Sequence, residues 1–254
     1  MSINEVKTGP STLSQVILKQ YGYKLKGHSG LIYSLMIVQL LGLLLSLGSS
    51  GGMSSTGNDS ISVVVQTHTG DILLIFSLLW LMVVASLLGS QPYQSMEFSV
   101  VNNRLVSHAS NILLLVTYAV YAGVTSTLAV IIHRLILSAT LKEGEFLFGG
   151  LQIIPQDLLL GIFVATLYFI LVAATVYLIQ SFSLHSKGLG IILWICFFAF
   201  GFGTVRIFDF NLGKVLEFYA AETSLGVFVL KVFCTAVLFF GSSMLITKGM
   251  EAKR

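Results

Sequence analysis

The chain has 254 residues, of which 55% are hydrophobic and only 10% are charged, and its mean hydropathy is +0.90. A soluble domain of this size would expose too much of that apolar surface to water, so the composition indicates an integral membrane protein. The net charge of +3 is too small to indicate nucleic-acid binding. Cys196 and Cys234 both lie inside apolar runs, which favours packing roles over a disulfide.

The first predicted element is an amphipathic helix over residues 11–28, because Ser11 can cap a helix and apolar residues then recur at spacings of three and four. A basic helix of this kind lies in the membrane interface, with its apolar face in lipid and its lysines among anionic headgroups. The alternative is a solvated arm beside the membrane. The residues expected to make this interfacial helix are Leu13, Val16, Ile17, Tyr21, Lys19 and Lys24.

Six apolar runs follow, each long enough to cross a bilayer as a helix, the shorter ones only just. A spanning helix needs about 20 apolar residues. An unpaired backbone amide in hydrocarbon costs several kcal/mol, which excludes irregular structure there. We therefore expect an all-α integral membrane protein with a single transmembrane domain over residues 1–254. The expected spans are residues 31–47, 72–88, 112–132, 158–179, 189–205 and 225–246.

The lysines and arginines predict the orientation, since cytoplasmic loops are enriched in them. With the amino terminus inside, nine basic residues are cytoplasmic and five are external. Both termini are then cytoplasmic, and we expect a multi-pass protein of the plasma membrane. The nine are Lys7, Lys19, Lys24, Lys26, Arg104, Lys187, Lys248, Lys253 and Arg254, and the five are Arg134, Lys142, Arg206, Lys214 and Lys231.

Two external segments stand out in this topology. Residues 48–71 are rich in Ser, Gly and Thr and lack positive charge, which is typical of a loop of low order, although residues 62–66 could form a short strand or part of a cap. Residues 206–224 mix charged and aromatic residues and are expected to form an amphipathic or re-entrant piece before the sixth span.

The main cytoplasmic feature between spans is the polar stretch of residues 91–111. Its core, residues 95–110, contains neither Gly nor Pro, and its apolar residues stand at helix-compatible intervals. We expect one or two short helices at the membrane surface, which would present polar side chains to a soluble partner. The residues expected to make this contact are Glu97, Asn103, Arg104 and His108.

This layout resembles the membrane (permease) subunit of a type-2 ABC exporter: an amphipathic amino-terminal helix, six spans, both ends inside and a cytoplasmic helical insertion between the second and third spans. The resemblance covers the whole chain in layout. In that family the insertion often carries an acidic residue and a run ending near Pro-x-Ser/Thr-Arg. Here Glu97 and residues 104–107 take those places, and the Pro is missing. The resemblance implies a homodimer, or a pair with a second permease subunit, driven by separate ABC ATPase subunits that dock on residues 11–28 and 91–111.

The sequence lacks the signatures of catalysis. No G-x-x-x-x-G-K-[ST] motif is present, so ATP would act through a partner subunit and no cofactor is expected to bind directly. No H-E-x-x-H motif or mid-span acidic pair indicates a metal site or an enzyme. No span carries a charge at its centre, which disfavours an ion-coupled carrier.

The spans do carry mild polar residues, which fit a path for a hydrophobic or amphipathic cargo such as a peptide, a lipid or a drug-like molecule. The alternative is that these residues form hydrogen bonds between helices. The candidate path-lining residues are Gln39, Ser77, Thr117, Thr127 and Thr166.

Two functions therefore remain open. The first is the permease subunit of an ATP-driven exporter, in which membrane lipid and ATPase subunits are the partners. The second is a stand-alone membrane immunity or scaffold protein that binds a toxic peptide.

Overall fold

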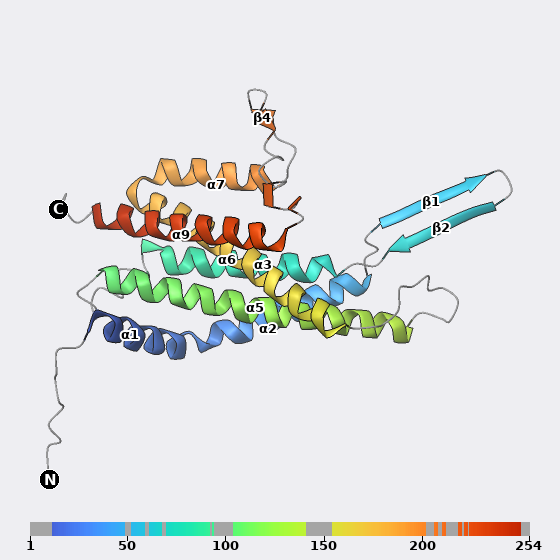
Figure 1. The fold of residues 1–254 in the computed structure, drawn as a ribbon, viewed down its shortest axis with the longest axis horizontal. Helices are drawn as coiled ribbons and strands as arrows, with labels where there is room; N and C mark the ends of the chain where they lie inside the picture. Colours follow the sequence, from blue (N-terminus) through green and yellow to red (C-terminus); the bar gives the residue numbers. More distant parts are fainter. Residues whose placement is uncertain are drawn as a thin grey trace, which may run out of the picture.

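The computed structural model describes residues 12–48, 52–58, 61–67, 70–91, 93, 104–140, 154–201, 206–207, 210–211, 218–219, 221–222 and 224–249. These residues form a helical bundle with two small antiparallel hairpins (Figure 1). The helices are α1 (Leu13–Gly27), α2 (Ser29–Gly48), α3 (Asp71–Gly89), α5 (Arg104–Thr140), α6 (Pro155–His185), α7 (Lys187–Gly201) and α9 (Leu225–Gly249).

The long helices run back and forth across the bundle. From α2 to α9 each helix reverses the direction of the one before it, so α1 and the end of α9 lie at the same end of the bundle (Figure 1). Among the described residues, five helices are long and apolar enough to cross a membrane, namely α2, α3, α5, α6 and α9. These helices confirm the prediction of a helical, multi-pass membrane protein, without fixing the number of spans.

The prediction of six spanning helices is not borne out in full. Helix α7 occupies most of the fifth predicted run but has only 15 residues. At 1.5 Å per residue it is about 22 Å long, whereas the hydrocarbon core is about 30 Å thick. The end of that run, residues 202–205, lies outside the described residues. Helix α7 nevertheless runs alongside the other helices of the bundle (Figure 1).

A hairpin extends from the end of the bundle opposite α1. Strands β1 (Gly52–Asn58) and β2 (Ile61–Thr67) pair antiparallel from Gly52 with Thr67 to Asn58 with Ile61. Of the two alternatives for residues 62–66, the short strand is the one found, within β2, whereas the expectation of low order is wrong for these two strands. In residues 206–224 the described part contains the short hairpin of β3 (Arg206–Ile207) and β4 (Phe210–Asn211).

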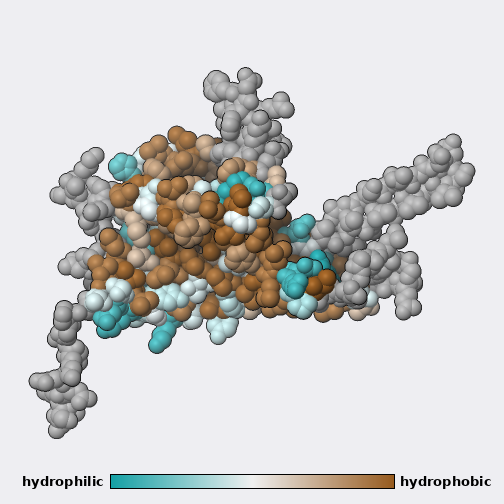
Figure 2. Space-filling model, in the orientation of Figure 1, coloured by the Kyte–Doolittle hydropathy of each residue, from teal (hydrophilic) through white to brown (hydrophobic). Residues whose placement is uncertain are grey.

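The core lies where α3, α5 and α6 meet. Small and branched side chains from all three helices are fully buried there, among them Leu81, Ala85, Leu115, Ala119 and Ala174. The outward faces are equally apolar, since Leu40 and Leu44 of α2 are each 58% exposed. Figure 2 shows hydrophobic residues over most of the visible bundle surface. An apolar exterior of this extent is what a lipid-facing surface requires.

The structure corrects the expected surface helix of residues 91–111. Its last part, from Arg104 onward, is the first part of α5, a single helix of 37 residues. No glycine or proline separates that part from the span, so the helix continues without a break. Ser107, His108 and Asn111 are buried. Glu97 and Asn103 lie outside the described residues.

Candidate functional site

Helix α5 carries a line of polar residues along one face. Asn111, Tyr118, Thr125 and His133 follow one another at intervals of seven or eight residues. Positions seven apart lie on nearly the same side of a helix with 3.6 residues per turn. Each of the four bonds a group from α1, α2 or the residue between them, and we call this set of contacts the polar seam.

The seam begins at Lys24 of α1, which is only 4% exposed. Its Nζ donates to the backbone carbonyl of Ser107 at 3.2 Å and also to Oδ1 of Asn111. The expectation that Lys24 lies among lipid headgroups is therefore wrong. The reason is periodicity: Ile17, Tyr21 and Lys24 stand at i, i+4 and i+7, so Lys24 continues the stripe that packs on α5.

Part of the remaining α1 stripe is also covered by α5. Tyr21 shares a hydrogen bond with the hydroxyl of Thr117 at 2.8 Å. Val16 and Ile17 are half-buried, while Leu13 is 54% exposed and Lys19 is exposed. Helix α1 is thus amphipathic as predicted, but its stripe packs against protein.

The seam then passes the break between α1 and α2 at His28. The His28 Nδ1–H donates to the Lys24 carbonyl at 2.8 Å, and the Tyr118 hydroxyl donates to the His28 carbonyl at 3.1 Å. The junction between the carboxyl end of α1 and the amino end of α2 is therefore hydrogen-bonded to α5.

The middle of the seam is a three-helix contact centred on Gln39, which is buried. Its Nε2 donates to Ser77 of α3 at 3.0 Å and to Thr125 of α5 at 2.9 Å. Both hydroxyls in turn donate to carbonyls of their own helices. The far end is a bond of 3.0 Å between Ser46 of α2 and Nε2 of His133.

His108 lies beside the seam and is buried instead of solvated, which corrects the expectation from the sequence. Its Nδ1 is 2.7 Å from the hydroxyl of Tyr177 on α6, and the two rings meet edge to face. This burial follows from the continuation of α5, because His108 occupies a helix face that packs on α6.

The candidate path-lining residues do not gather on one surface. Gln39 and Ser77 belong to the middle of the seam, and Thr117 contacts α1. Thr127 donates to its own helix at Gly123, and Thr166 of α6 lies against that same glycine. Gln39, Ser77 and Thr117 therefore make hydrogen bonds between helices, whereas the Thr127 hydroxyl bonds within α5.

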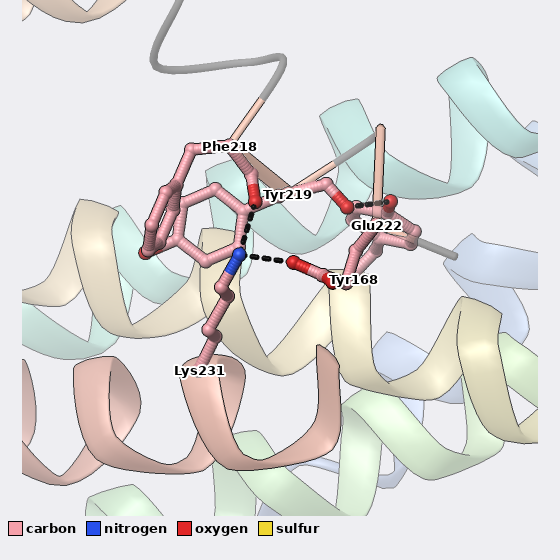
Figure 3. Close-up of polar contacts among 5 residues, drawn as sticks. All are labelled: Tyr168, Phe218, Tyr219, Glu222 and Lys231. Carbon is pink, nitrogen blue, oxygen red and sulfur yellow. Dashed lines mark hydrogen bonds and ion pairs between the residues drawn. The ribbon is translucent and has the colours of Figure 1, made fainter. Parts of the chain in front are cut away.

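A second polar cluster lies near the start of α9, where Lys231 holds the short segment before it (Figure 3). The Lys231 ammonium pairs with Glu222, donates to the Phe218 carbonyl at 3.1 Å and lies 3.9 Å from the centre of the Phe218 ring. Tyr168 of α6 donates to the Tyr219 carbonyl at 3.3 Å. Because the ion pair is about one-fifth exposed on both sides, it contributes modestly to stability.

The described carboxylates lie at one end of the bundle, whereas basic residues occur at both ends, with Arg134 and Lys231 at the carboxylate end. Lys19, Lys24, Lys26 and Lys187 belong to α1 and to the start of α7, at one end (Figure 1). The described carboxylates Asp71, Asp157 and Glu222 begin or precede α3, α6 and α9, at the opposite end. Within the described ranges no cluster of His, Cys, Asp and Glu suits a metal ion.

Comparison of the chain with protein-family models, with curated proteins and with solved structures gives no match. The seam residues Ser46, Asn111, Tyr118, Thr125 and His133 were not expected from the sequence as a site. Their regular spacing along α5 is the signal that would have revealed them.

Proposed function

We propose that this protein is the permease subunit of an ATP-driven exporter for a hydrophobic or amphipathic cargo, energised by separate ATPase subunits. The observation that carries the proposal is the docking of α1 on the start of α5 through Lys24. A soluble partner that binds this end of the bundle could move α5 directly, because the two helices are joined by buried hydrogen bonds.

Helix α5 is suited to transmit such a movement. It is about 55 Å long at 1.5 Å per residue, and it packs against α1, α2, α3, α6 and α9. A displacement at its first turn is therefore communicated to most of the bundle. The proposed contact surface for the ATPase is α1 together with residues 91–104, including Glu97, Asn103 and Arg104.

The arrangement of the helices supports the rest of the proposal. The helices from α2 to α9 alternate in direction and return the chain to the α1 end (Figure 1). The lysines at the α1 end and the carboxylates at the other favour a cytoplasmic α1 end. We therefore propose that both termini lie on the cytoplasmic side of the plasma membrane, as in the type-2 exporters that the sequence resembles.

The seam also indicates where a path would lie. The side chains of Gln39, Ser77 and Thr125 bond one another, so they are not available to a passing cargo. We place the path between two copies of this chain, or between this chain and a second permease subunit.

The test uses the full chain coexpressed with a Walker-type ATPase encoded beside its gene. We expect the two to copurify and the chain to stimulate ATP hydrolysis. Arg104→Glu, and independently Glu97→Lys, should uncouple hydrolysis from transport while insertion is retained. Arg134→Glu is the matched control, since it reverses an exposed charge near the other end of α5, about 45 Å away, and should leave coupling intact. Failure to copurify with any ATPase would contradict the proposal.

The second candidate is a stand-alone immunity or scaffold protein that binds a toxic peptide. The internal pairing of the seam favours it, because a bundle whose polar groups bond each other is suited to a fixed scaffold. Deletion of the adjacent ATPase gene separates the two functions. A permease loses its phenotype in that strain, whereas a stand-alone binder keeps it.

A further inference from the structure

Two shallow grooves run along α3 on its membrane-facing side. The first lies between α3 and α7, has a volume of about 330 Å³ and is lined by Leu79, Met82, Val83, Ser86, Leu87, Trp194 and Phe198. The second lies between α3 and the α1–α2 junction, has a volume of about 300 Å³ and is lined by His28, Leu31, Val84, Leu87, Leu88, Ser90 and Tyr93. Leu87 lines both, so it forms the ridge that separates them.

The shape of this surface suits two parallel apolar chains. Leu79, Val83 and Leu87 stand four residues apart on α3 and are 45%, 59% and 52% exposed, so they form one ridge along the helix. The first groove offers no unused polar group, because the Ser86 hydroxyl donates to the Met82 carbonyl of its own helix. An occupant of this groove must therefore be apolar along its length.

The second groove differs because it ends among polar groups. His28 and Tyr93 lie with their ring centres 5.3 Å apart, and Ser90, which follows the last residue of α3, donates its hydroxyl to the Leu87 carbonyl at 2.7 Å. The His28 Nδ1 is occupied by the Lys24 carbonyl. Within the part of the chain that the structure describes, no other hydrogen bond of the His28 ring is found. Because Nδ1 carries the hydrogen of its bond, Nε2 offers a lone pair that can accept from a headgroup hydroxyl.

The charge at this end of the bundle selects the headgroup. Lys19 and Lys26 are exposed on α1, and the described carboxylates belong to the opposite end of the helices. A positive membrane-proximal surface attracts anionic lipids, by about 1 kcal/mol for each basic residue near the bilayer surface.

From these observations we propose that the two grooves bind one anionic phospholipid, with an acyl chain on each side of Leu87 and a hydroxyl of its headgroup, such as that of phosphatidylglycerol, donating to His28 Nε2. The lipid belongs to the leaflet at the α1 end. It fills the space beside α7, which among the described helices packs chiefly on α6. The proposal depends only on the membrane location of the bundle, so it stands or falls independently of any ATPase.

The experiment compares lipids on the full chain purified in a maltoside detergent. Native mass spectrometry counts the retained dioleoyl phosphatidylglycerol or dioleoyl phosphatidylcholine, and thermal unfolding in mixed micelles measures stabilisation by each lipid. We expect one phosphatidylglycerol to be retained and to raise the unfolding midpoint more than phosphatidylcholine does. Equal retention and equal stabilisation by the two lipids would overturn the proposal.

Variants locate the lipid. Ser86→Trp fills the first groove and should weaken retention of phosphatidylglycerol about tenfold or more, which corresponds to about 1.4 kcal/mol. Ile75→Trp is the matched control, because Ile75 lies on the same exposed stripe of α3 but lines neither groove. Equal loss in both variants would overturn the assignment to the grooves.

A second pair of variants tests the headgroup and does not depend on the folding of Ser86→Trp. His28→Gln should reduce the preference for phosphatidylglycerol over phosphatidylcholine, whereas His185→Gln, at an exposed position on α6 at the same end, should keep it. An unchanged preference in His28→Gln would overturn the headgroup position. If Ser86→Trp instead abolished dimerisation without affecting lipid retention, the groove would belong to a second copy of the chain and the proposal would fail.

Discussion

Helix α5 has two faces that are packed by different means. Toward α1 and α2 it presents the polar seam, in which Asn111, Tyr118, Thr125 and His133 each meet a polar partner. Toward α6 it presents small residues, and Gly123 lies so close to Thr166 that an added Cβ would be 2.2 Å from its Oγ1 and 3.1 Å from its backbone nitrogen.

The two faces of α5 determine different features of the bundle, namely the register of the helices and the distance between them. Apolar surface alone gives helices in lipid little reason to choose one register, because lipid tails are as apolar as leucine. Hydrogen bonds are directional, so the seam fixes the register of α5 against α1 and α2. A glycine at a crossing fixes the distance between helices instead. Three substitutions separate the contribution of the hydrogen bonds from that of the close helix crossing.

The largest effect is expected at the α1 end of the seam. Asn111→Leu removes an acceptor from the buried Lys24 ammonium, and a hydrogen bond to a charged group contributes about 1.5–3 kcal/mol. We expect a loss of about 2–3 kcal/mol in the free energy of unfolding, measured by titration with sodium dodecyl sulfate in mixed micelles. Asn111→Asp, which keeps an acceptor, should retain most of the stability. Equal losses in the two variants would show that the site depends on side-chain volume and not on the bond.

The α6 face is tested by Gly123→Ala. The new methyl group would collide with Thr166 Oγ1 and lie tightly against the Thr166 backbone, so this residue or its helix must shift, and overpacking of this kind costs about 1–3 kcal/mol. Gly161→Ala is the control, since its Cβ would meet only the Thr127 methyl at an ordinary 3.7 Å. The same unfolding titration should show a loss of about 2 kcal/mol in the first variant and little change in the second. Similar values for both would contradict the close crossing.

The smallest effect is expected in the middle of the seam. Gln39→Leu removes two hydrogen bonds, but Ser77 and Thr125 keep their bonds to the Leu73 and Tyr121 carbonyls, so no donor is left unpaired. Bonds of this kind between membrane helices contribute about 0.6 kcal/mol on average, so we expect a loss of about 1 kcal/mol. A loss as large as that of Asn111→Leu would mean that Gln39, and not Lys24, is the main anchor of the seam.

Much of the fold followed from the sequence. The apolar runs alone predict an all-α membrane protein, because lipid leaves the backbone no partner outside its own helix. The stripe of Ile17 and Tyr21 predicts α1, and the β-branched residues near Val64 predict a strand. The length of α7 was not predicted, since hydropathy marks an apolar segment but does not say where its helix ends.

The tertiary structure decided how the polar residues are used. A lysine on an amphipathic stripe can bind lipid headgroups or a buried acceptor. Only the position of Asn111 in the folded bundle gives Lys24 a buried acceptor. His108 belongs to a polar stretch of the sequence, yet it is buried against Tyr177. The reason is that α5 begins several residues before the apolar run that predicted it. Sequence periodicity determined which residues share a helix face, since that depends on local geometry. Which helix covers that face depends on contacts between distant segments, and these exist only in the folded bundle.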